Sequence, residues 1–141
     1  MAKSQEIKKR YINSIDKHLD DIIDNKATEM FEIEDFAEII CIHPTHLSDT
    51  IKKTTGISAC GLYQVKIMER ALRLLKNRSL TIQDIALQLT YEPSQFTKWF
   101  KRITNLTPKH YRFRLSKPNG VNVNSEIMTI LKNHVDIPLC F

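Results

Sequence analysis

The sequence predicts an all-α protein with two helix-turn-helix units, a long helix that connects them, and a C-terminal extension. Apolar residues recur every three or four positions along most of the chain, which is the period of amphipathic helices. Only three glycines and five prolines occur among 141 residues, which argues against disorder and against a turn-rich β protein. A stretch that begins at Ile33 also repeats 49 residues later without a gap. The predicted segments are 1–57 for the first unit, 58–78 for the connecting helix, 79–115 for the second unit, and 116–141 for a linker and tail.

Positive charge is concentrated in one part of the chain. The formal net charge is +5, with thirteen basic and twelve acidic residues in 1–79, but seven basic and two acidic residues in 80–117. Residues 118–141 hold one basic and two acidic residues. A surface that faces nucleic-acid phosphates needs such an excess. The distribution therefore favours a nucleic-acid partner that is contacted mainly by residues 80–117.

The cysteines and the lack of long apolar runs indicate where the protein works. The three cysteines are odd in number and far apart, and no signal peptide is recognisable, which predicts a reducing, cytoplasmic location. No apolar run approaches the roughly 20 residues that a membrane-spanning helix needs. We therefore expect no membrane partner and, if the nucleic-acid partner is DNA, an association with the nucleoid.

Residues 5–25 predict an amphipathic helix. One face carries Ile7, Tyr11, Ile15 and Leu19 at helical spacing, and the other face is basic at first and acidic near the end. Acidic residues oppose the dipole at a helix C-terminus, so the helix is expected to fray near Asn25. The acidic face is either a solvated surface of a packing helix or a docking surface for a partner protein.

The two copies of the repeat have the same residue types at corresponding positions. Each has a small alanine where two helices approach closely, a proline at the start of the second helix, and a residue that tolerates the left-handed conformation at its end. The main pairs are Asp35 with Asp84, Phe36 with Ile85, Ala37 with Ala86, Pro44 with Pro93, Leu47 with Phe96, Ile51 with Phe100, Gly56 with Asn105, and Ser58 with Thr107. Both copies are therefore predicted to be helix-turn-helix units.

The second copy shows the two faces of a recognition helix most clearly. Thr81 is a predicted N-cap with Asp84 three residues later, and Pro93 suits the first position of the next helix. The helix that follows has an apolar face of Phe96, Trp99, Phe100 and Ile103. Its other side is polar and basic, with Ser94, Gln95, Lys98, Lys101 and Arg102. This is the arrangement of a helix that packs on one side and enters a DNA groove on the other.

The remaining segments connect or extend these units. Residues 58–77 predict a helix that is apolar on more than one side and, with about nineteen helical residues, roughly 28 Å long. Successive major-groove faces of B-DNA are ~34 Å apart. A shorter helix is expected from Pro108 to about Leu115, where free N–H groups could bind a phosphate. Residues 116–124 predict a linker, 125–135 an amphipathic helix with Ile127, Ile130, Leu131 and Val135 on one face, and 137–141 an apolar end.

Three sets of motifs stand out along the chain. They are Phe36-Ala37, Pro44-x-x-Leu47 and Lys52-Lys53-x-x-Gly56-Ile57 in the first unit, Glu69-Arg70-Ala71-x-x-Leu74-Leu75 in the connecting helix, and Ile85-Ala86, Phe96-x-x-x-Phe100-Lys101-Arg102 and Thr107-Pro108-x-x-Tyr111-Arg112 in the second unit. Through these motifs the chain resembles, over residues 5–115, the DNA-binding domain of AraC/XylS-type transcriptional regulators. The resemblance implies a seven-helix fold that places two recognition helices in adjacent major grooves. It further implies a promoter-binding activator that contacts RNA polymerase. Because the chain shows no effector-binding domain, it resembles small stand-alone members, or an output module whose sensor is a separate protein.

Four features depart from the family pattern. The turn at residues 90–92 is one residue shorter than usual and lacks the family's glycine, and Ile67 stands where an arginine is common. Asp49 occupies a position that usually reads bases or phosphates, where an acid opposes phosphate contact. The tail after residue 116 lies outside the family domain.

Resemblance and chemistry together give a set of DNA-contact candidates. Those expected to read bases are Thr45, Ser48, Asp49, Ser94, Gln95 and Lys98, and those expected to contact the DNA backbone are His46, Lys53, Thr97, Lys101, Arg102, Lys109 and Arg112. Two of them have alternatives: Asp49 as an exposed helix residue without a DNA contact, and Arg112 as a structural ion-pair partner. Trp99 is expected in the core rather than stacked on a base.

Metal and catalytic sites are not expected. Cys41, His43 and His46 are of metal-ligand type, but a closed zinc site takes four ligands and no fourth is near in sequence. No glycine-rich nucleotide loop, paired-cysteine motif or nucleophile with a His–carboxylate partner occurs, so neither a cofactor nor catalysis is expected. The alternative function is a protein-interaction module on the same fold, with weak or non-specific DNA binding.

Overall fold

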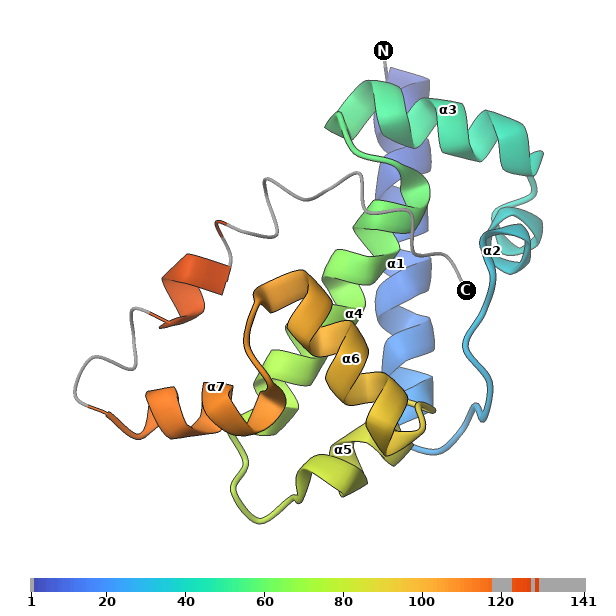
Figure 1. The fold of residues 1–141 in the computed structure, drawn as a ribbon. Helices are drawn as coiled ribbons and strands as arrows, with labels where there is room; N and C mark the ends of the chain where they lie inside the picture. The colour runs from blue at the N-terminus through green and yellow to red at the C-terminus, as the bar shows by residue number, and fades with distance from the viewer. Residues whose placement is uncertain (1, 118–122, 128, 130–141) are drawn as a thin grey trace. The chain divides into compact units, whose positions relative to one another are not determined.

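The computed structural model describes residues 2–117, 123–127 and 129, and all regular secondary structure in these residues is helical. The helices are α1 (Ala2–Ile23), α2 (Ile33–Ile39), α3 (Pro44–Thr55), α4 (Ala59–Leu75), α5 (Ile82–Gln88), α6 (Pro93–Thr104) and α7 (Pro108–Leu115) (Figure 1). Residues 123–127 are also helical. The predicted all-α class is confirmed. None of the described helices has the length and apolar character that crossing a bilayer requires.

The chain forms two compact units whose boundary falls within α4. Among the described residues, unit 1 comprises those up to Ile67 and unit 2 those from Met68 onwards. α4 has 17 residues and is therefore about 25 Å long. Its N-terminal half belongs to unit 1 and its C-terminal half to unit 2. Each unit contains one pair of short helices with a tight turn, α2 and α3 in unit 1 and α5 and α6 in unit 2.

The core of unit 1 is built on α1. The face predicted to be apolar is buried, and α1 packs against α2 and α3 (Figure 1). Tyr11 is fully buried, and its hydroxyl donates a 2.7 Å hydrogen bond to the carbonyl of Ala59 at the start of α4. Phe36 presents its ring edge-on to Tyr11 and Tyr63, with ring centroids 5.6 and 5.0 Å away. Edge-to-face pairs of this kind add stability beyond area burial.

His18 holds the connection between α1 and α2 against the core. Its Nε2 accepts a 3.0 Å hydrogen bond from the backbone N–H of Phe31, and the two rings stack with centroids 3.8 Å apart. The side chain is buried, and burial lowers the pKa of His18, while the nearby Asp21 and Asp35 oppose that shift. The neutral imidazole is the form that accepts this bond.

The core of unit 2 is aromatic. Phe96, Trp99 and Phe100 on α6 are buried, and Tyr111 on α7 meets Phe100 with ring centroids 5.9 Å apart. Trp99 is 1% exposed and stacks on Tyr91 at 5.3 Å, so its predicted place in the core is confirmed. Because these large side chains occupy one side of α6, its other side is left to polar residues.

The internal repeat extends to the backbone conformation of both turns. Cys41 and Thr90 are corresponding residues, and both adopt positive φ, 60° and 70°. The next residue in each turn donates its N–H to the corresponding alanine carbonyl: Ile42 to Ala37 at 3.0 Å, and Tyr91 to Ala86 at 2.8 Å. Thr90 thus takes a left-handed conformation that glycine adopts more readily than threonine. Because threonine is β-branched, this conformation strains the backbone at Thr90.

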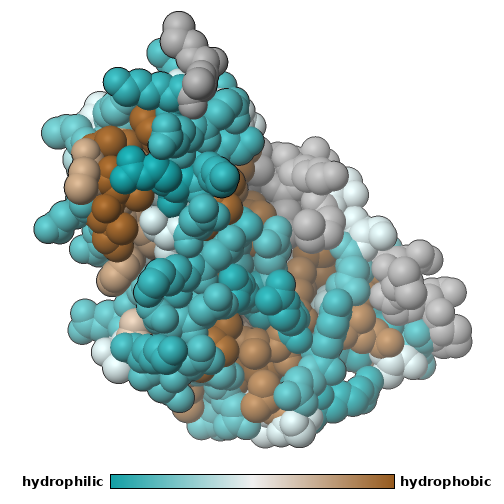
Figure 2. Space-filling view, turned by 180° about the vertical axis from the view of Figure 1, so that it is seen from behind, coloured by the Kyte–Doolittle hydropathy of each residue, from teal (hydrophilic) through white to brown (hydrophobic). Residues whose placement is uncertain are grey.

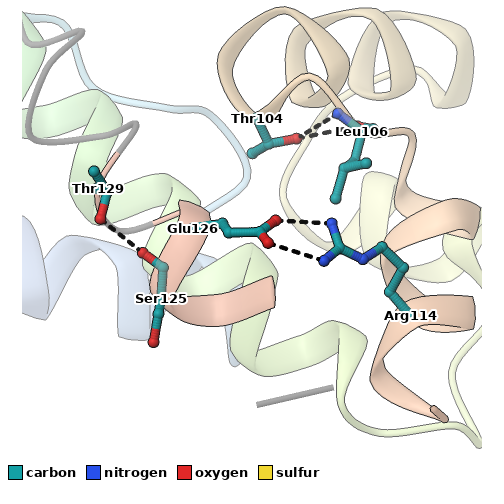
Figure 3. Close-up of polar contacts among 6 residues, drawn as sticks. All are labelled: Thr104, Leu106, Arg114, Ser125, Glu126 and Thr129. Atoms are coloured by element: carbon teal, nitrogen blue, oxygen red, sulfur yellow. Dashed lines mark hydrogen bonds and ion pairs between the residues drawn. The ribbon is translucent and has the colours of Figure 1, made fainter. Parts of the chain in front are cut away.

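The ends of α3 and α6 also match. Gly56 and Asn105 end them with φ of 79° and 65°, which confirms the left-handed ends expected from sequence. Thr55 Oγ1 donates to the Ile51 carbonyl at 2.7 Å, and Thr104 Oγ1 donates to the Phe100 carbonyl at 2.8 Å. Each threonine hydroxyl also receives the N–H two residues later (Thr104 and Leu106 in Figure 3).

The structure confirms the helix starts that were predicted from capping residues and prolines. Thr81 Oγ1 accepts from the Asp84 N–H at 2.9 Å, and the Asp84 carboxylate accepts from the Thr81 N–H at 3.0 Å. These two bonds lower the pKa of Asp84. Ser58 and Thr107 cap α4 and α7 in the same way, by accepting the N–H three residues later. Pro44, Pro93 and Pro108 each occupy the first turn of their helix.

The C-terminal extension contributes a short helix to unit 2. Residues 123 and 124 are already helical, ahead of the predicted start at 125, and Val123 and Ile127 are buried. Arg114 of α7 forms two hydrogen bonds with Glu126, of 2.8 and 3.1 Å, while the Thr129 hydroxyl bonds the Ser125 carbonyl (Figure 3). The predicted apolar positions Ile130, Leu131 and Val135 and the apolar end 137–141 lie outside the described residues.

Hydrophilic side chains cover most of the face seen in Figure 2, with hydrophobic areas between them. Among the described residues, the large hydrophobic side chains that are mainly exposed are Ile39 on α2, Leu87 on α5 and Phe113 on α7. Lys117 covers the Phe113 ring with its ammonium group 4.4 Å from the centroid. A cation at that position partly shields the exposed aromatic face.

Candidate nucleic-acid interface

α6 separates its core face from its polar face completely. Five residues, Phe96, Trp99, Phe100, Ile103 and Thr104, are buried, at the spacing that marks one side of a helix. The other side exposes Ser94, Gln95, Lys98, Lys101 and Arg102, and Thr97 is half-buried between the two faces. All the sequence-predicted candidates on α6 except Thr97 are therefore on its exposed surface, and their side chains are free to reach a base edge or a phosphate.

α3 has the same division but a different chemistry. Leu47, Thr50 and Ile51 are buried, while Thr45, His46, Asp49 and Lys53 are exposed and Ser48 is half-buried. The helix begins at Pro44, and His43 Nδ1 accepts a 3.1 Å bond from the Thr45 N–H. His43 therefore acts as a helix cap. Within the described residues, no group of three potential ligands is placed to hold a metal ion.

A groove of about 580 Å³ runs along the polar side of α3. Its walls include Thr45, Ser48 and Asp49 of α3, Glu34 of α2, and Lys52. Two carboxylates and one ammonium group give this groove an acidic balance. Such a lining opposes phosphate, but a carboxylate can accept a hydrogen bond from the amino group of cytosine.

The repeat makes the two exposed faces directly comparable. Thr45 corresponds to Ser94 and Asp49 corresponds to Lys98. The stretch 33–58 carries two basic and four acidic residues, whereas 82–107 carries three basic and two acidic residues. The position that is cationic on α6 is thus anionic on α3, and the excess charge favours phosphate approach to α6.

The basic residues of α7 are used in different ways. Lys109 is exposed in the first turn. Arg112 instead donates from Nε to the Leu75 carbonyl at 3.0 Å and from Nη2 to the Asn77 carbonyl at 2.9 Å. Its guanidinium thus joins α7 to the end of α4 through carbonyl groups, a structural role that differs from the ion pair expected as the alternative. Its contact with the DNA backbone stays a prediction.

Two structural roles have no local signal in the sequence. Arg114 is paired with Glu126, twelve residues later and across the predicted linker, so only the position of the C-terminal helix reveals it. The Tyr111 hydroxyl of α7 donates to the side-chain oxygen of Asn124, which lies in the same C-terminal helix as Glu126. Burial raises the pKa of Tyr111 to about 12, which keeps that donor protonated.

Comparison with known proteins adds independent information. A family model described as a helix-turn-helix domain matches residues 36–114. The chain is 34% identical over 85 residues to YobQ, an uncharacterised HTH-type transcriptional regulator of Bacillus subtilis. The match covers 60% of this chain and 35% of that protein. It is 29% identical over 109 residues to the lactose operon transcription activator of Staphylococcus xylosus, covering 77% and 39%. The chain thus spans well under half the length of these curated relatives.

Solved structures agree with the fold. An AraC-type DNA-binding domain-containing regulator from Chromobacterium violaceum superposes with a TM-score of 0.68 at 20% identity, covering 84% of this chain and 99% of that one. At that identity the likeness shows the fold alone. The C-terminal domain of AraT, a response regulator from Geobacillus stearothermophilus, has a TM-score of 0.65 and 30% identity, and the match covers 76% of this chain and 84% of that one.

Proposed function

Because the chain belongs to the AraC-type helix-turn-helix family of DNA-binding transcription regulators, we propose that it reads a specific operator with α3 and α6 in adjacent major grooves. The family membership makes it a double-stranded DNA-binding module and not an enzyme. The sequence specificity, the two-groove arrangement and the direction of regulation are the parts that we propose.

The observation that carries this function is the division of α6 into a buried aromatic face and an exposed polar face. A helix held rigidly by Phe96, Trp99 and Phe100 presents its other side in a fixed orientation, which base reading requires. Gln95 has the donor and acceptor pair that matches adenine, and Lys98 can donate to guanine or to a phosphate. Lys101 and Arg102 near the end of the helix supply charge for the backbone without sequence preference.

We assign transcription activation on the strength of two relatives. The proteins from Staphylococcus xylosus and Yersinia pestis that match this chain are named as a lactose operon transcription activator and as an F1 operon positive regulatory protein. An activator on this fold would bind a promoter, contact RNA polymerase, and work in the cytoplasm.

Base reading by α6 is tested by selecting binding sites from a random duplex pool and then measuring affinity for the selected and a scrambled duplex. Gln95→Ala should weaken binding to the selected duplex by ~1–3 kcal/mol and leave the scrambled duplex nearly unchanged. Gln83→Ala, which removes an exposed glutamine from α5, is the matched control. Equal losses on both duplexes would refute base reading by Gln95.

Backbone contact is tested by the salt dependence of the same affinities. Arg102→Ala should weaken all duplexes alike and lower the slope of log K against log salt by about one. A loss confined to the selected duplex would contradict that role. A selected motif with two blocks about one helical turn apart would support reading by both helices, whereas one block would leave α3 without a base-reading role.

The acidic groove beside α3 favours one alternative function. A module whose first helix pair repels phosphate could act mainly through a protein partner, with weak DNA binding by α6 alone. Selection that yields no motif, together with weak and purely salt-controlled binding, would support this alternative over operator recognition.

A further inference from the structure

A small cavity of about 260 Å³ in unit 2 is lined mainly by cations. It lies where α4 and α7 end, and its walls are Leu75, Lys76, Arg78, Arg112 and Leu115. Three of these five residues are basic and none is acidic. None of the residues that line the cavity belongs to the exposed face of α3 or α6. The cavity is therefore not part of either recognition helix.

Hydrogen bonds fix the groups around this cavity before any ligand binds. Arg112 is held by the Leu75 and Asn77 carbonyls, so its guanidinium has one orientation. The loop that carries Arg78 is shaped by Asn77, whose side-chain oxygen accepts from the Ser79 N–H at 3.1 Å and from the Ser79 hydroxyl at 2.6 Å. The Leu80 N–H bonds the Asn77 carbonyl at 3.1 Å. A preorganised cluster of donors binds a ligand with a smaller ordering cost than a flexible one.

The residues that line the cavity carry more positive charge than the neighbouring negative groups neutralise. The C-termini of α4 and α7 carry helix dipoles equivalent to about half a negative charge each, and three cations surround them. Arg112 is partly buried, and both its burial and the neighbouring Arg78 lower the pKa of its guanidinium. Glu126, the acidic residue of the C-terminal helix, is bound to Arg114. Two guanidinium groups that repel each other beside an opening without a carboxylate are placed to share an anion.

We propose that this cavity binds a phosphoryl group. Arg112 supplies fixed donors at its edge, and Arg78 and Lys76 supply charge from the loop. The volume admits a phosphate with a few waters, since one water occupies about 30 Å³ in the liquid. The phosphoryl group comes either from the DNA backbone beside the bases that α6 reads, in which case the proposal rests on the proposed function, or from a free phosphorylated small molecule.

Titration with inorganic phosphate tests the site itself, with amide chemical shifts of residues 76–80 as the readout. Wild-type protein should show saturable shifts, and Arg78→Gln should weaken binding by about tenfold or more, the loss expected for one charge-assisted contact. Arg78 is exposed in a loop, so this variant keeps the fold, as circular dichroism verifies. Arg73→Gln is the matched control, because Arg73 is an exposed arginine in the last turn of α4 that does not line the cavity.

The salt dependence of duplex binding separates the two sources. If Arg78→Gln lowers the slope of log K against log salt by about one, and Arg73→Gln leaves that slope unchanged, the site binds the DNA backbone. Saturable phosphate binding with unchanged slopes assigns it to a free phosphorylated molecule. Two results together would overturn the proposal. Phosphate would cause no saturable shifts, or would bind Arg78→Gln and Arg73→Gln equally well, and the salt slopes of these two variants would also be the same. Failure of wild-type protein to bind any duplex would instead refute the proposed function and leave the phosphate titration valid.

Discussion

The two helix-turn-helix pairs have nearly the same scaffold and clearly different surfaces. Corresponding residues adopt left-handed conformations in both turns and at both helix ends, and Thr55 and Thr104 make the same hydrogen bonds. At the exposed position where α6 carries Lys98, however, α3 carries Asp49. The buried and turn residues have kept one geometry, whereas the exposed residues have acquired different charges.

This difference shows that geometry and recognition are specified by separate residues on the same helix. A recognition helix needs its buried face to be oriented, and its exposed face is then free to change. We therefore expect variants of the buried face to affect unfolding similarly in both units, and variants of the exposed face to affect DNA binding unequally.

Truncation of equivalent core residues should be costly in both units. Phe100 and Ile51 are corresponding residues and both are fully buried. Phe100→Ala should lower the free energy of unfolding by ~3–5 kcal/mol and Ile51→Ala by ~2–5 kcal/mol, because each leaves a cavity. Urea unfolding followed by circular dichroism measures both. If one variant were nearly as stable as wild type, the two scaffolds would not be equivalent.

Exchange of the charges at the corresponding exposed position should move DNA affinity in opposite directions. Lys98→Asp should weaken binding to the selected duplex by ~1–3 kcal/mol. Asp49→Lys should strengthen binding to all duplexes and raise the salt slope by about one, because it gives α3 the charge present on α6.

Glu29→Lys is the control for this exchange, because it changes the net charge equally in the exposed connection between α1 and α2. A gain from Asp49→Lys no larger than the gain from Glu29→Lys would show that α3 does not approach DNA.

Relief of the left-handed turn should stabilise unit 2 slightly. Thr90 is β-branched, exposed and at φ 70°, a conformation that costs non-glycine residues roughly 1–2 kcal/mol. Thr90→Gly removes that cost but adds ~0.5–1 kcal/mol of unfolded-state entropy, so a net gain of about 0.5–1 kcal/mol is expected. Thermal unfolding measures it. Cys41→Gly should gain less, because cysteine is not β-branched, and a loss of stability in Thr90→Gly would show that its side chain contributes more than the strain removes.

Acidification should destabilise unit 1 through His18. Burial lowers the pKa of His18 below the value near 6.5 of an unfolded chain. Between the pKa of His18 in the folded state and its value in the unfolded chain, the unfolded state therefore binds more protons. The contribution of His18 to the free energy of unfolding is complete above about pH 6.5 and is lost as the pH falls from there towards the folded pKa.

Unfolding curves recorded between pH 7 and pH 5 check this dependence against His18→Gln. The glutamine carbonyl can still accept from the Phe31 N–H, but it does not titrate. Identical pH dependence of the two proteins would exclude His18 as the titrating group.

The local features of the fold could be predicted because each has a short-range cause. Pro93 at a helix start, Thr81 with Asp84 as a cap, and Asn105 at a helix end act within a few residues. The exposed face of α6 was predictable for the same reason, since its apolar face is continuous. The predicted roles in DNA contact remain predictions.

The features that the sequence did not predict depend on contacts between distant residues or on strain. Arg112 meets carbonyls at residues 75 and 77, and Arg114 meets Glu126, only after the chain has folded back. The positive φ of Cys41 and Thr90 runs against residue preference, so their identity gave no indication of it. Burial of His18 depends on stacking with Phe31 across a loop whose course is not coded locally.

The buried residues of the C-terminal helix have a consequence for the order in which the protein is made. Val123 and Ile127 complete the packing of unit 2, yet the ribosome adds them after the helices α4 to α7. The described helices of unit 1 all precede them, so these helices can acquire their structure first. We expect nascent chains halted after Leu115 to resist proteolysis in unit 1 while unit 2 is still cleaved, and chains halted beyond Thr129, once it has left the ribosome, to resist it in both.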